Sequence, residues 1–344
     1  MVSRAGAALA LLLLACLSAS LPAQAHDVKD PVCRMMTDTD TTPYRETVGG
    51  KTYFFCSDGC KARFDKAPAA YVTLNAGLAA GQTRSYRLTL DIAPRPVPGR
   101  PTLLSFAIHE APTGRVVRDF EVVHTKPLHF LIVSADMAYF EHQHPKLGPD
   151  GRFRLLWTFP RAGRYFLFAD FTPADGDNQI LRTTLDIGRS TRMVPPRLVP
   201  DADRAKVVGD TRITLAIRPS VMRAGRQSLL TYTLSDLSGR GRTDMQPILG
   251  VMGHLIALHG ATQTLVHTHA LHSVQAGSYG AAMLRMMQAG QTEVVPITPA
   301  MVTLSGPRFT FKLTLPRPGR YRLWAQFQRQ NRWLTVPFTV DVRE

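Results

Sequence analysis

The chain has 344 residues, 44% of them hydrophobic, and carries a formal net charge of +15 because 41 Lys and Arg outnumber 26 Asp and Glu. This length predicts two or three domains with ordinary cores. A basic chain of this kind could bind nucleic acid, but the signal-like residues 1–25 predict export from the cytoplasm, which argues against that class. An anionic membrane surface or acidic proteins are the partners that the charge favours, and solubility alone is the plainer explanation.

Residues 1–25 have the features of a secretory signal peptide. They combine one Arg, an apolar run to about Leu17 and a small-residue ending at Ala23-Gln24-Ala25. The sequence contains no second apolar run of about 18 residues that would predict a spanning helix. We therefore predict an exported, periplasmic protein.

Two features near this segment leave alternatives open. Leu13-Leu14-Ala15-Cys16 resembles a lipobox, and processing there would leave a lipoprotein anchored through Cys16. Cleavage after Ala25 would instead expose His26, whose amino group and ring nitrogen could chelate Cu(II).

Residues 26–76 form a compact module that contains the three cysteines of the mature chain, Cys33, Cys56 and Cys60. An odd, clustered set of thiols is a poor disulfide framework in an oxidising compartment, and it indicates metal binding or a reactive thiol. A disulfide between Cys56 and Cys60, with Cys33 buried, is the alternative.

The spacing within the module also bears on thiol chemistry. Cys56 and Cys60 are four residues apart, so a helix beginning near Ser57 would place both near its first turn. Helix N-termini lower thiol pKa values, and the nearby positive charges of Lys51, Lys61 and Arg34 favour thiolates further. The core of this module is predicted from its aromatic residues, Tyr53, Phe54, Phe55, Phe64 and Tyr71.

This segment resembles the YHS (TRASH-like) domain. The matching positions are Asp30, Pro31, Cys33, Met35, Gly50, Lys51, Tyr53, Phe55, Cys56, Ser57, Cys60, Phe64, Pro68 and Tyr71. Members are often attached to heavy-metal transporters and other metal-handling proteins, and their cysteines are taken as ligands. The resemblance therefore implies a small α+β module with a Cys33, Cys56 and Cys60 metal site. The sequence departs from the family at Arg34, where Gly is usual.

From Ser85 onward the sequence is mainly β, because short alternating or apolar runs are separated by Pro and Gly. PRAGRYFLFADF at Pro160–Phe171 recurs as PRPGRYRLWAQF at Pro316–Phe327. We predict two tandem antiparallel β-sandwich domains, immunoglobulin-like or cupredoxin-like, over residues 82–190 and 205–344. The second carries an insertion at about residues 271–305.

Each predicted sandwich contains the same histidine pattern, HxxxxxxxxxxxxHxH. The two triplets are His129, His142 and His144, and His254, His267 and His269. If each lies on a hairpin centred between its first two histidines, those two face each other and the third shares their side of the strand. In the second copy this register predicts a two-residue type II′ turn at Gly260-Ala261.

Three imidazoles on one face could bind one ion, so we predict one three-His site in each sandwich. The plainer alternative is strand histidines that only make hydrogen bonds at a sheet rim. Weaker candidate ligands are His124, His272 and the methionines of the insertion, Met283, Met286 and Met287. On a helix these methionines share one face, which is typical of core packing as well as of copper ligation.

Imidazole suits copper and zinc, and thiolate or thioether ligands favour Cu(I). We therefore predict that the bound ion is copper, with Cu(I) favoured and zinc as the alternative. The predicted function is copper sequestration or delivery in metal resistance, with a metal transporter or another envelope metal-handling protein as partner.

Two other classes remain open. A three-His site can also be catalytic, and Asp136 and Glu141 would be its acid or base candidates, but the second copy has Ala261 and Val266 at the equivalent positions. We therefore do not expect an enzyme, and a three-His metalloenzyme is the first alternative. The second is a structural envelope adaptor protein.

Overall fold

The computed structural model describes residues 27–39, 42–56, 58–72, 84–92, 95–174, 176–188, 196–249, 251–270 and 306–344. The predicted signal peptide, Cys16, His26, His272 and the three methionines of the insertion lie outside these residues. Among the described helices, none is both long and apolar enough to span a bilayer.

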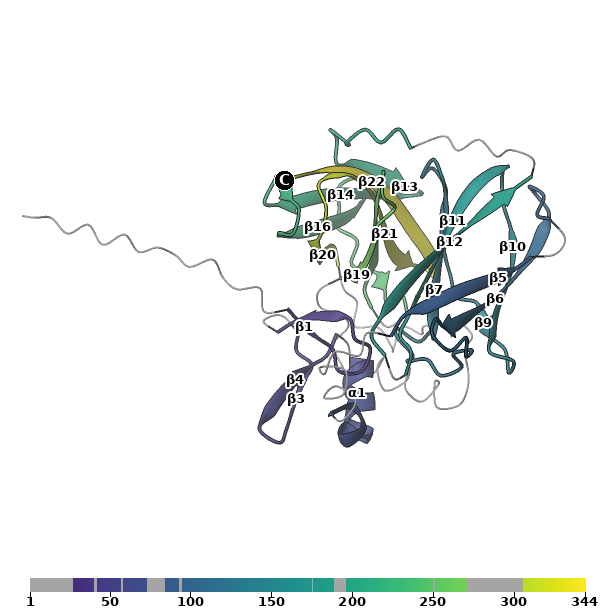
Figure 1. Ribbon diagram of the computed structural model, residues 1–344. Coiled ribbons are helices and arrows are strands. Elements are labelled where there is room, and N and C mark those ends of the chain that lie inside the picture. Colours follow the sequence, from purple (N-terminus) through teal and green to yellow (C-terminus); the bar gives the residue numbers. More distant parts are fainter. Residues whose placement is uncertain are drawn as a thin grey trace, which may run out of the picture.

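The N-terminal module contains two small antiparallel sheets and a helix (Figure 1). Its elements are β1 (Asp27–Lys29), β2 (Met36–Asp38), β3 (Arg45–Val48), β4 (Lys51–Phe54) and α1 (Asp58–Lys66). Gly49 and Gly50 form the β3–β4 turn with φ values of 59° and 78°, a left-handed conformation that glycine adopts without strain.

Aromatic side chains hold this module together. Tyr53, Phe55 and Phe64 are buried and Tyr71 packs against them, as predicted, whereas Phe54 is only half-buried and lies outside this cluster. The Phe64 ring lies 5.0 Å from the Phe55 ring and 5.1 Å from the Tyr53 ring, centroid to centroid. The helix therefore packs on the β3–β4 hairpin mainly through Phe64, and Lys61 adds an ion pair with Glu46 of β3.

The first β-sandwich follows. Its strands are β5 (Tyr86–Asp91), β6 (Pro101–Glu110), β7 (Leu128–Ser134), β8 (Phe140–Gln143), β9 (Lys146–Leu147), β10 (Arg152–Thr158), β11 (Gly163–Phe171) and β12 (Gln179–Ile187). They form two sheets, in the orders β5-β6-β10-β9 and β12-β11-β7-β8. Stacked phenylalanines fill the core between them, where the Phe106 ring lies 4.7 Å from Phe130 and 5.4 Å from Phe153.

The second sandwich repeats this arrangement. Its strands are β13 (Ala205–Val208), β14 (Thr211–Arg218), β15 (Met222–Arg223), β16 (Gln227–Asp236), β17 (Met245–Gln246), β18 (His254–His259), β19 (Leu265–His269), β20 (Arg308–Thr314), β21 (Gly319–Arg329) and β22 (Arg332–Arg343). The sheets have the orders β13-β14-β16-β20 and β15-β22-β21-β18-β19, and β17 pairs with β21. The predicted fold class, a small α+β module followed by two tandem β-sandwiches, is confirmed.

The two sandwiches pack against each other through equivalent sheets. Leu128, Phe130 and Ile132 of β7 point into their own core, while Leu131 and Val133 point outward into a second apolar cluster. That cluster also contains Ile256, Leu258 and Trp324 of the second sandwich. Because both faces of β7 and β18 are covered, every residue in these two strands is buried.

The predicted hairpin register is wrong by two residues in both copies. β7 and β8 pair Leu131 with His142, so His144 rather than His142 is next to His129 in register, and β18 and β19 pair His254 with His269. Each loop has five residues, 135–139 and 260–264, and a side chain caps each of them. The Asp136 carboxylate accepts hydrogen bonds from the Ser134 hydroxyl and the Ala138 amide in the first copy.

In the second copy, the ring of His259 has this capping role. Its Nδ1 accepts from the amides of Ala261 and Thr262, at 3.2 and 3.0 Å, and its Nε2 donates to the Pro318 carbonyl at 3.0 Å. The two-residue type II′ turn therefore does not form. A shift of two residues preserves strand alternation, so each histidine still lies on the predicted face.

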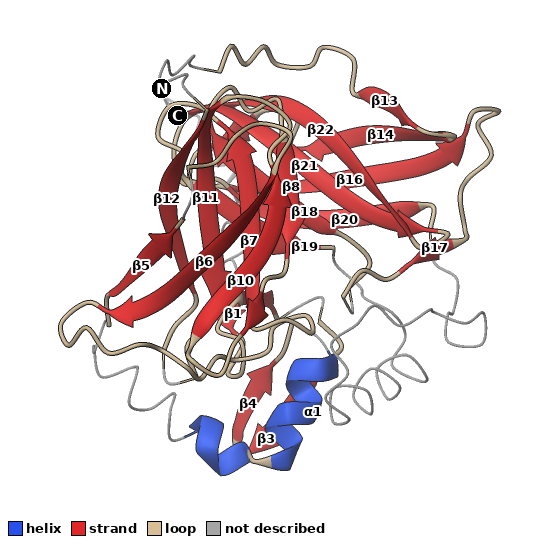
Figure 2. Cartoon of the chain, turned by 90° about the vertical axis from the view of Figure 1, so that its right-hand side faces the viewer, coloured by secondary structure: helices blue, strands red, loops and turns tan. Residues whose placement is uncertain are grey.

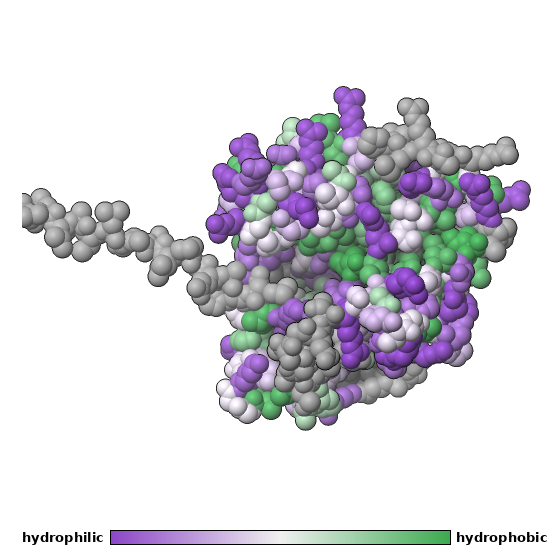
Figure 3. All heavy atoms as spheres, viewed as in Figure 1, coloured by the Kyte–Doolittle hydropathy of each residue, from purple (hydrophilic) through white to green (hydrophobic). Residues whose placement is uncertain are grey.

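The N-terminal module lies at one end of the sandwich pair, beneath β7 and β10 in Figure 2. Thr172 donates a hydrogen bond from its hydroxyl to the Cys33 carbonyl at 2.8 Å, and Arg63 forms an ion pair with Glu121. Lys29 pairs with Asp177 at 3.0 Å. On the face drawn in Figure 3, hydrophilic side chains cover much of the sandwiches and apolar residues gather between them.

Candidate metal centres

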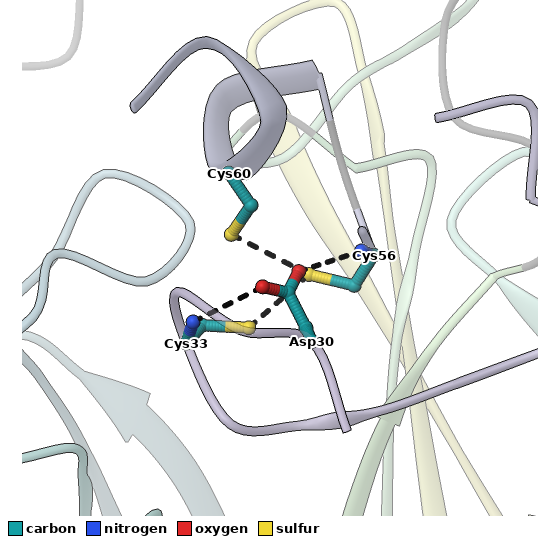
Figure 4. Close-up of side chains that lie close together, drawn as sticks. All are labelled: Asp30, Cys33, Cys56 and Cys60. Atoms are coloured by element: carbon teal, nitrogen blue, oxygen red, sulfur yellow. Dashed lines mark hydrogen bonds between the residues drawn. The ribbon is translucent and has the colours of Figure 1, made fainter. Parts of the chain in front are cut away.

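Three thiols converge on one point in the N-terminal module, as Figure 4 shows. The Cys56 sulfur lies 3.4 Å from that of Cys33 and 3.7 Å from that of Cys60. All three cysteines are free, so the alternative of a Cys56–Cys60 disulfide does not describe this structure. With Asp30, their ligand atoms lie within 4.8 Å of one another and could hold a metal ion. We call these four residues the thiol centre.

Asp30 organises the thiol centre. Its carboxylate accepts hydrogen bonds from the amides of Val32 at 2.7 Å, Cys33 at 3.2 Å and Cys56 at 2.7 Å. Burial, together with the charge of Cys60, raises the pKa of Asp30 to about 8. Asp30 therefore ties the loop that carries Cys33 to the segment that carries Cys56.

The expected stabilisation of thiolates by Lys51 and Lys61 is not seen. Lys61 instead donates to Glu46 at 2.7 Å and Asp65 at 2.8 Å, and Lys51 lies over the Tyr53 ring. Burial raises the pKa of Cys33 well above its usual value. A cation bound among the sulfurs would reverse this preference, because a coordinated thiol loses its proton.

Arg34 has a φ of 66°, in the left-handed region that favours glycine. This conformation fits the Gly that is usual at this position in the YHS domain. An arginine there adds backbone strain and a positive charge beside the thiol centre.

The two histidine triplets meet between the sandwiches instead of forming two separate sites. The ring centroids of His142 and His254, from different domains, are 5.3 Å apart, and those of His129 and His267 are 5.4 Å apart. We call the six residues of the two triplets the histidine centre. They lie on the outer faces of the β7–β8 and β18–β19 hairpins, beside the apolar cluster that joins the domains.

In the first domain, hydrogen bonds fix which ring nitrogen carries the proton. His129 Nε2 lies 3.1 Å from the Val123 carbonyl, and a carbonyl can only accept, so Nε2 carries the proton and Nδ1 has the lone pair. His142 Nδ1 donates to the Gln326 side-chain oxygen at 2.9 Å. The Gln326 amide nitrogen donates to Thr335, which sets the orientation of that amide.

The second domain repeats this arrangement. His254 Nε2 lies 3.3 Å from the Ile248 carbonyl, and His267 Nδ1 donates to the Asp170 carboxylate at 2.7 Å. Asp170 and Gln326 occupy the same position in the repeated strands β11 and β21. Each domain therefore supplies the acceptor that orients a histidine of the other domain.

In the first domain these bonds leave two unprotonated nitrogens facing each other, and in the second the lone pair of His254 Nδ1 faces His267 Nε2. His129 Nδ1 lies 3.0 Å from His142 Nε2, and His254 Nδ1 lies 3.2 Å from His267 Nε2. His144 Nε2 lies 3.2 Å from His129 Nδ1. Tetrahedral ligands at about 2.0–2.1 Å from a metal ion would be about 3.3 Å apart, so these spacings are close to those of a first coordination shell.

His142 belongs to two groups that could hold a metal ion. One is the predicted triplet of His129, His142 and His144, and the other combines His142 with His254 and His267 across the interface. His269 does not join its predicted partners in such a group within the described residues. Its ring instead lies 3.9 Å from the ring of His124, centroid to centroid.

Burial keeps these imidazoles neutral. It lowers the pKa of His129 to about 3 and that of His124 to about 4. Burial is also the main cause of the low pKa values of His142, His144, His254 and His269. Asp170 stays ionised because hydrogen bonding to His267 lowers its pKa, although burial opposes this. Neutral imidazole is the form that binds metal ions.

Sequence reasoning missed three residues of this region: Asp170, Gln326 and Met35. Asp170 and Gln326 lie in the repeated segment, but nothing in that repeat indicates contact with the other domain. Met35 lines a small pocket together with His129, His267 and His269, so the N-terminal module reaches the histidine centre.

Fold and sites define a tandem β-sandwich protein with an N-terminal cysteine module and clustered histidines. The chain belongs to the family described as "Domain of unknown function (DUF8832)", whose model matches residues 74–188 and 205–344. The YHS domain model matches residues 28–75. No curated protein sequence matches the chain.

Solved structures with tandem β domains align with much of the chain at low similarity. The adhesin FdeC of Escherichia coli is 13% identical, with 76% of this chain and 66% of that chain covered and a TM-score of 0.22. The adhesin InvE of Yersinia pseudotuberculosis is 12% identical, with 73% of this chain and 58% of that chain covered and a TM-score of 0.20. A segment of two fibronectin type III domains from chicken tenascin is 10% identical, with 74% of this chain and 97% of that chain covered and a TM-score of 0.19. The chain thus spans less than two thirds of the two adhesin structures.

Proposed function

We propose that this protein is an exported copper-binding protein that holds Cu(I) for sequestration or delivery in metal resistance. The observation that carries the proposal is the pair of facing, unprotonated nitrogens in the first domain, His129 Nδ1 and His142 Nε2 at 3.0 Å. Two lone pairs this close and this buried repel each other, and a cation between them removes that repulsion.

One feature favours copper over zinc. The donors of the thiol centre are mainly thiols, which bind either metal, but Met35 adds a thioether to the pocket beside the histidines. A thioether is a ligand for Cu(I) rather than for zinc, and imidazole binds either metal. Since histidine and methionine are neutral ligands, the ion can exchange between sites without any redox chemistry.

The signal-like residues 1–25 support export to the periplasm, and Cys16 supports a lipid anchor as an alternative. The YHS match at residues 28–75 supports metal ions as partners. A metal transporter or another envelope metal-handling protein is the proposed recipient, and the net charge of +15 would favour an anionic membrane surface.

A carrier fits the site better than a metalloenzyme. Asp136 caps its loop and pairs with Arg161 at 2.8 Å, so it does not serve as a base beside the histidines. Asp170 is the carboxylate at the site, and both of its oxygens are engaged, by His267 and by Asn178. These residues position ligands and have the geometry of outer-shell partners rather than of a free acid or base.

Native mass spectrometry of the reduced mature protein, titrated with Cu(I) and separately with Zn(II), tests the proposal. We expect Cu(I) at both centres, and retention of the histidine-bound ion after Cys33, Cys56 and Cys60 are all replaced by Ser. His142→Ala should then remove it, whereas His109→Ala, whose ring bonds Thr89 and Gly114 at a distance from the site, should not. Binding of neither metal would favour the structural adaptor class instead, and turnover with bound metal would favour the enzyme.

A further inference from the structure

We propose that His124 and His269 form a further metal position for a soft monovalent cation such as Cu(I), lying between the thiol centre and the other five residues of the histidine centre. This inference rests on the proposed copper function. It assigns a role to two imidazoles that belong to none of the three groups able to hold a metal ion among the described residues.

The first observation is a pair of buried, unsatisfied nitrogens. The Nε2 atoms of His124 and His269 are both buried, and neither makes a hydrogen bond among the residues that the structure describes. The two rings lie 3.9 Å apart, centroid to centroid, and tilt by 53°. Buried imidazole nitrogens usually have partners, so two orphans side by side point to a missing ligand.

The second observation is the backbone that carries His124. Val123 and Lys126 exchange two backbone hydrogen bonds, at 2.9 and 3.0 Å, around a two-residue turn. Both turn residues are left-handed, with φ values of 47° at His124 and 69° at Thr125. Asn and Gly are the residues that such a turn prefers, so this tight turn is strained. Strain of this kind persists where the surroundings hold a residue in a functional position.

The third observation is the place of this turn between the two centres. The side chain of Val123 packs in the core of the N-terminal module beside Cys33 and Cys60, and its carbonyl accepts from His129 of the histidine centre. His124 therefore directly follows a residue that shares a core cluster with two of the thiols and a hydrogen bond with the histidine centre. Met35, two residues after Cys33, lines the pocket that also contains His269.

These features describe a position suited to ligand exchange. A two-imidazole site binds Cu(I) with two neutral donors, and Met35 offers a thioether as a third. An ion that leaves the thiol centre exchanges sulfur for nitrogen ligands, the released thiolate takes up a proton from solvent, and copper remains Cu(I) throughout. We infer that an ion moving between the two centres passes through this position.

Nitrogen-15 NMR of histidine side chains in the full mature protein, titrated with Cu(I), tests the site, because Cu(I) is diamagnetic. We expect the Nε2 signal of His269 and the Nδ1 signal of His129 to move. His124→Asn should abolish the shift at His269 and retain that at His129. Asn tolerates a left-handed turn, so this variant should fold. His109→Ala is the matched control and should change neither shift.

The outcomes separate this inference from the proposed function. If His129 shifts and His269 does not, the position between the centres is wrong and copper binding stands. If neither shifts, the proposed function fails as well. The transfer role has its own readout, the rate at which the thiolate-to-copper absorption equilibrates after one equivalent of Cu(I) is added. We expect His124→Asn to slow this rate at least about tenfold, and an unchanged rate would overturn the relay.

Discussion

The two sandwich domains repeat the same arrangement of histidines but differ in the residue that orients the second histidine. In both, a histidine on the central strand donates to a backbone carbonyl six residues earlier, and its lone pair faces a second histidine. The acceptor that orients the second histidine differs, since Gln326 serves His142 and Asp170 serves His267. The repeated geometry conserves the direction of the lone pairs, while the charge behind them has diverged.

The third histidine of each repeat differs as well. His144 turns toward His129 within its own triplet, whereas His269 turns toward His124 at the edge of the N-terminal module. Thr172 and Glu121 of the first domain bond that module, and Met35 of the module shares a pocket with His267 and His269 of the second domain. The histidine centre is therefore asymmetric. His269 of the second triplet lies beside His124, whereas His142 of the first triplet lies beside the neutral amide of Gln326.

Removing the ligand that both halves share should have the largest effect. His142 belongs to both groups that could hold an ion, so His142→Ala should weaken Cu(I) binding at the histidine centre by more than about 100-fold. His144→Ala, which touches one group, should have a smaller effect. Competition with a chromophoric Cu(I) chelator, in a protein with all three cysteines replaced by Ser, measures both. Equal effects of the two variants would contradict a shared His142.

Exchanging the acceptors should break the asymmetry in both directions. Asp170→Asn removes the carboxylate that polarises His267 and should weaken binding by about 10- to 100-fold. Gln326→Glu is the matched reverse change and should tighten binding by about tenfold, because it gives His142 the charged acceptor that His267 has. The same chelator assay applies. No change in affinity for either variant would show that the difference between the repeats has no bearing on the metal.

Acid should destabilise the metal-free protein, because protons bind its buried histidines more readily once the chain unfolds. The pKa values of His129 and His124 fall from about 6.5 in the unfolded chain to about 3 and about 4 in the folded protein, so the unfolded state binds more protons at low pH. Stability is full above about pH 6.5 and is lost as the pH falls toward 4. At pH 5 the loss is at most about 2 kcal/mol for each such imidazole.

Thermal unfolding of the metal-free protein between pH 7.5 and pH 5 measures this loss. His129→Gln should flatten the dependence, because it removes one titrating ring and retains a polar side chain. A Tm that does not change with pH would show that the histidines are not buried as neutral rings.

Removing the hydrogen bond between Thr172 and the N-terminal module should have the smallest effect. Thr172 is fully buried and donates to the Cys33 carbonyl, so Thr172→Val should lower the free energy of unfolding by about 1 kcal/mol. Chemical denaturation measures this change, and Gln328→Val, at the equivalent position of the second domain, is the comparison. A larger loss in the second variant would show that docking adds little to the first domain.

Much of this arrangement could be predicted from the sequence, for physical reasons. Strand alternation alone places His142 and His144 on one face, and that result survived a register error of two residues. The repeat Pro160–Phe171 identified the duplicated domains. The loop length was wrong because Asp136 and His259 cap their turns with side chains, which the turn signals of the sequence do not show.

What the sequence could not predict depends on contacts between domains. His142 and Gln326 are 184 residues apart, and no local pattern relates them. The same is true of Asp170 and His267, which are 97 residues apart. His124 was only a weak candidate, because its role depends on a strained turn that its neighbours do not favour.

The most direct test of the central claim is an anomalous difference map from crystals of the copper-loaded protein. We predict a peak within bonding distance of His142 Nε2 that also has ligand nitrogens from the second domain, such as His254 Nδ1 or His267 Nε2. A map with copper at the thiol centre and none between the sandwiches would contradict the shared histidine centre.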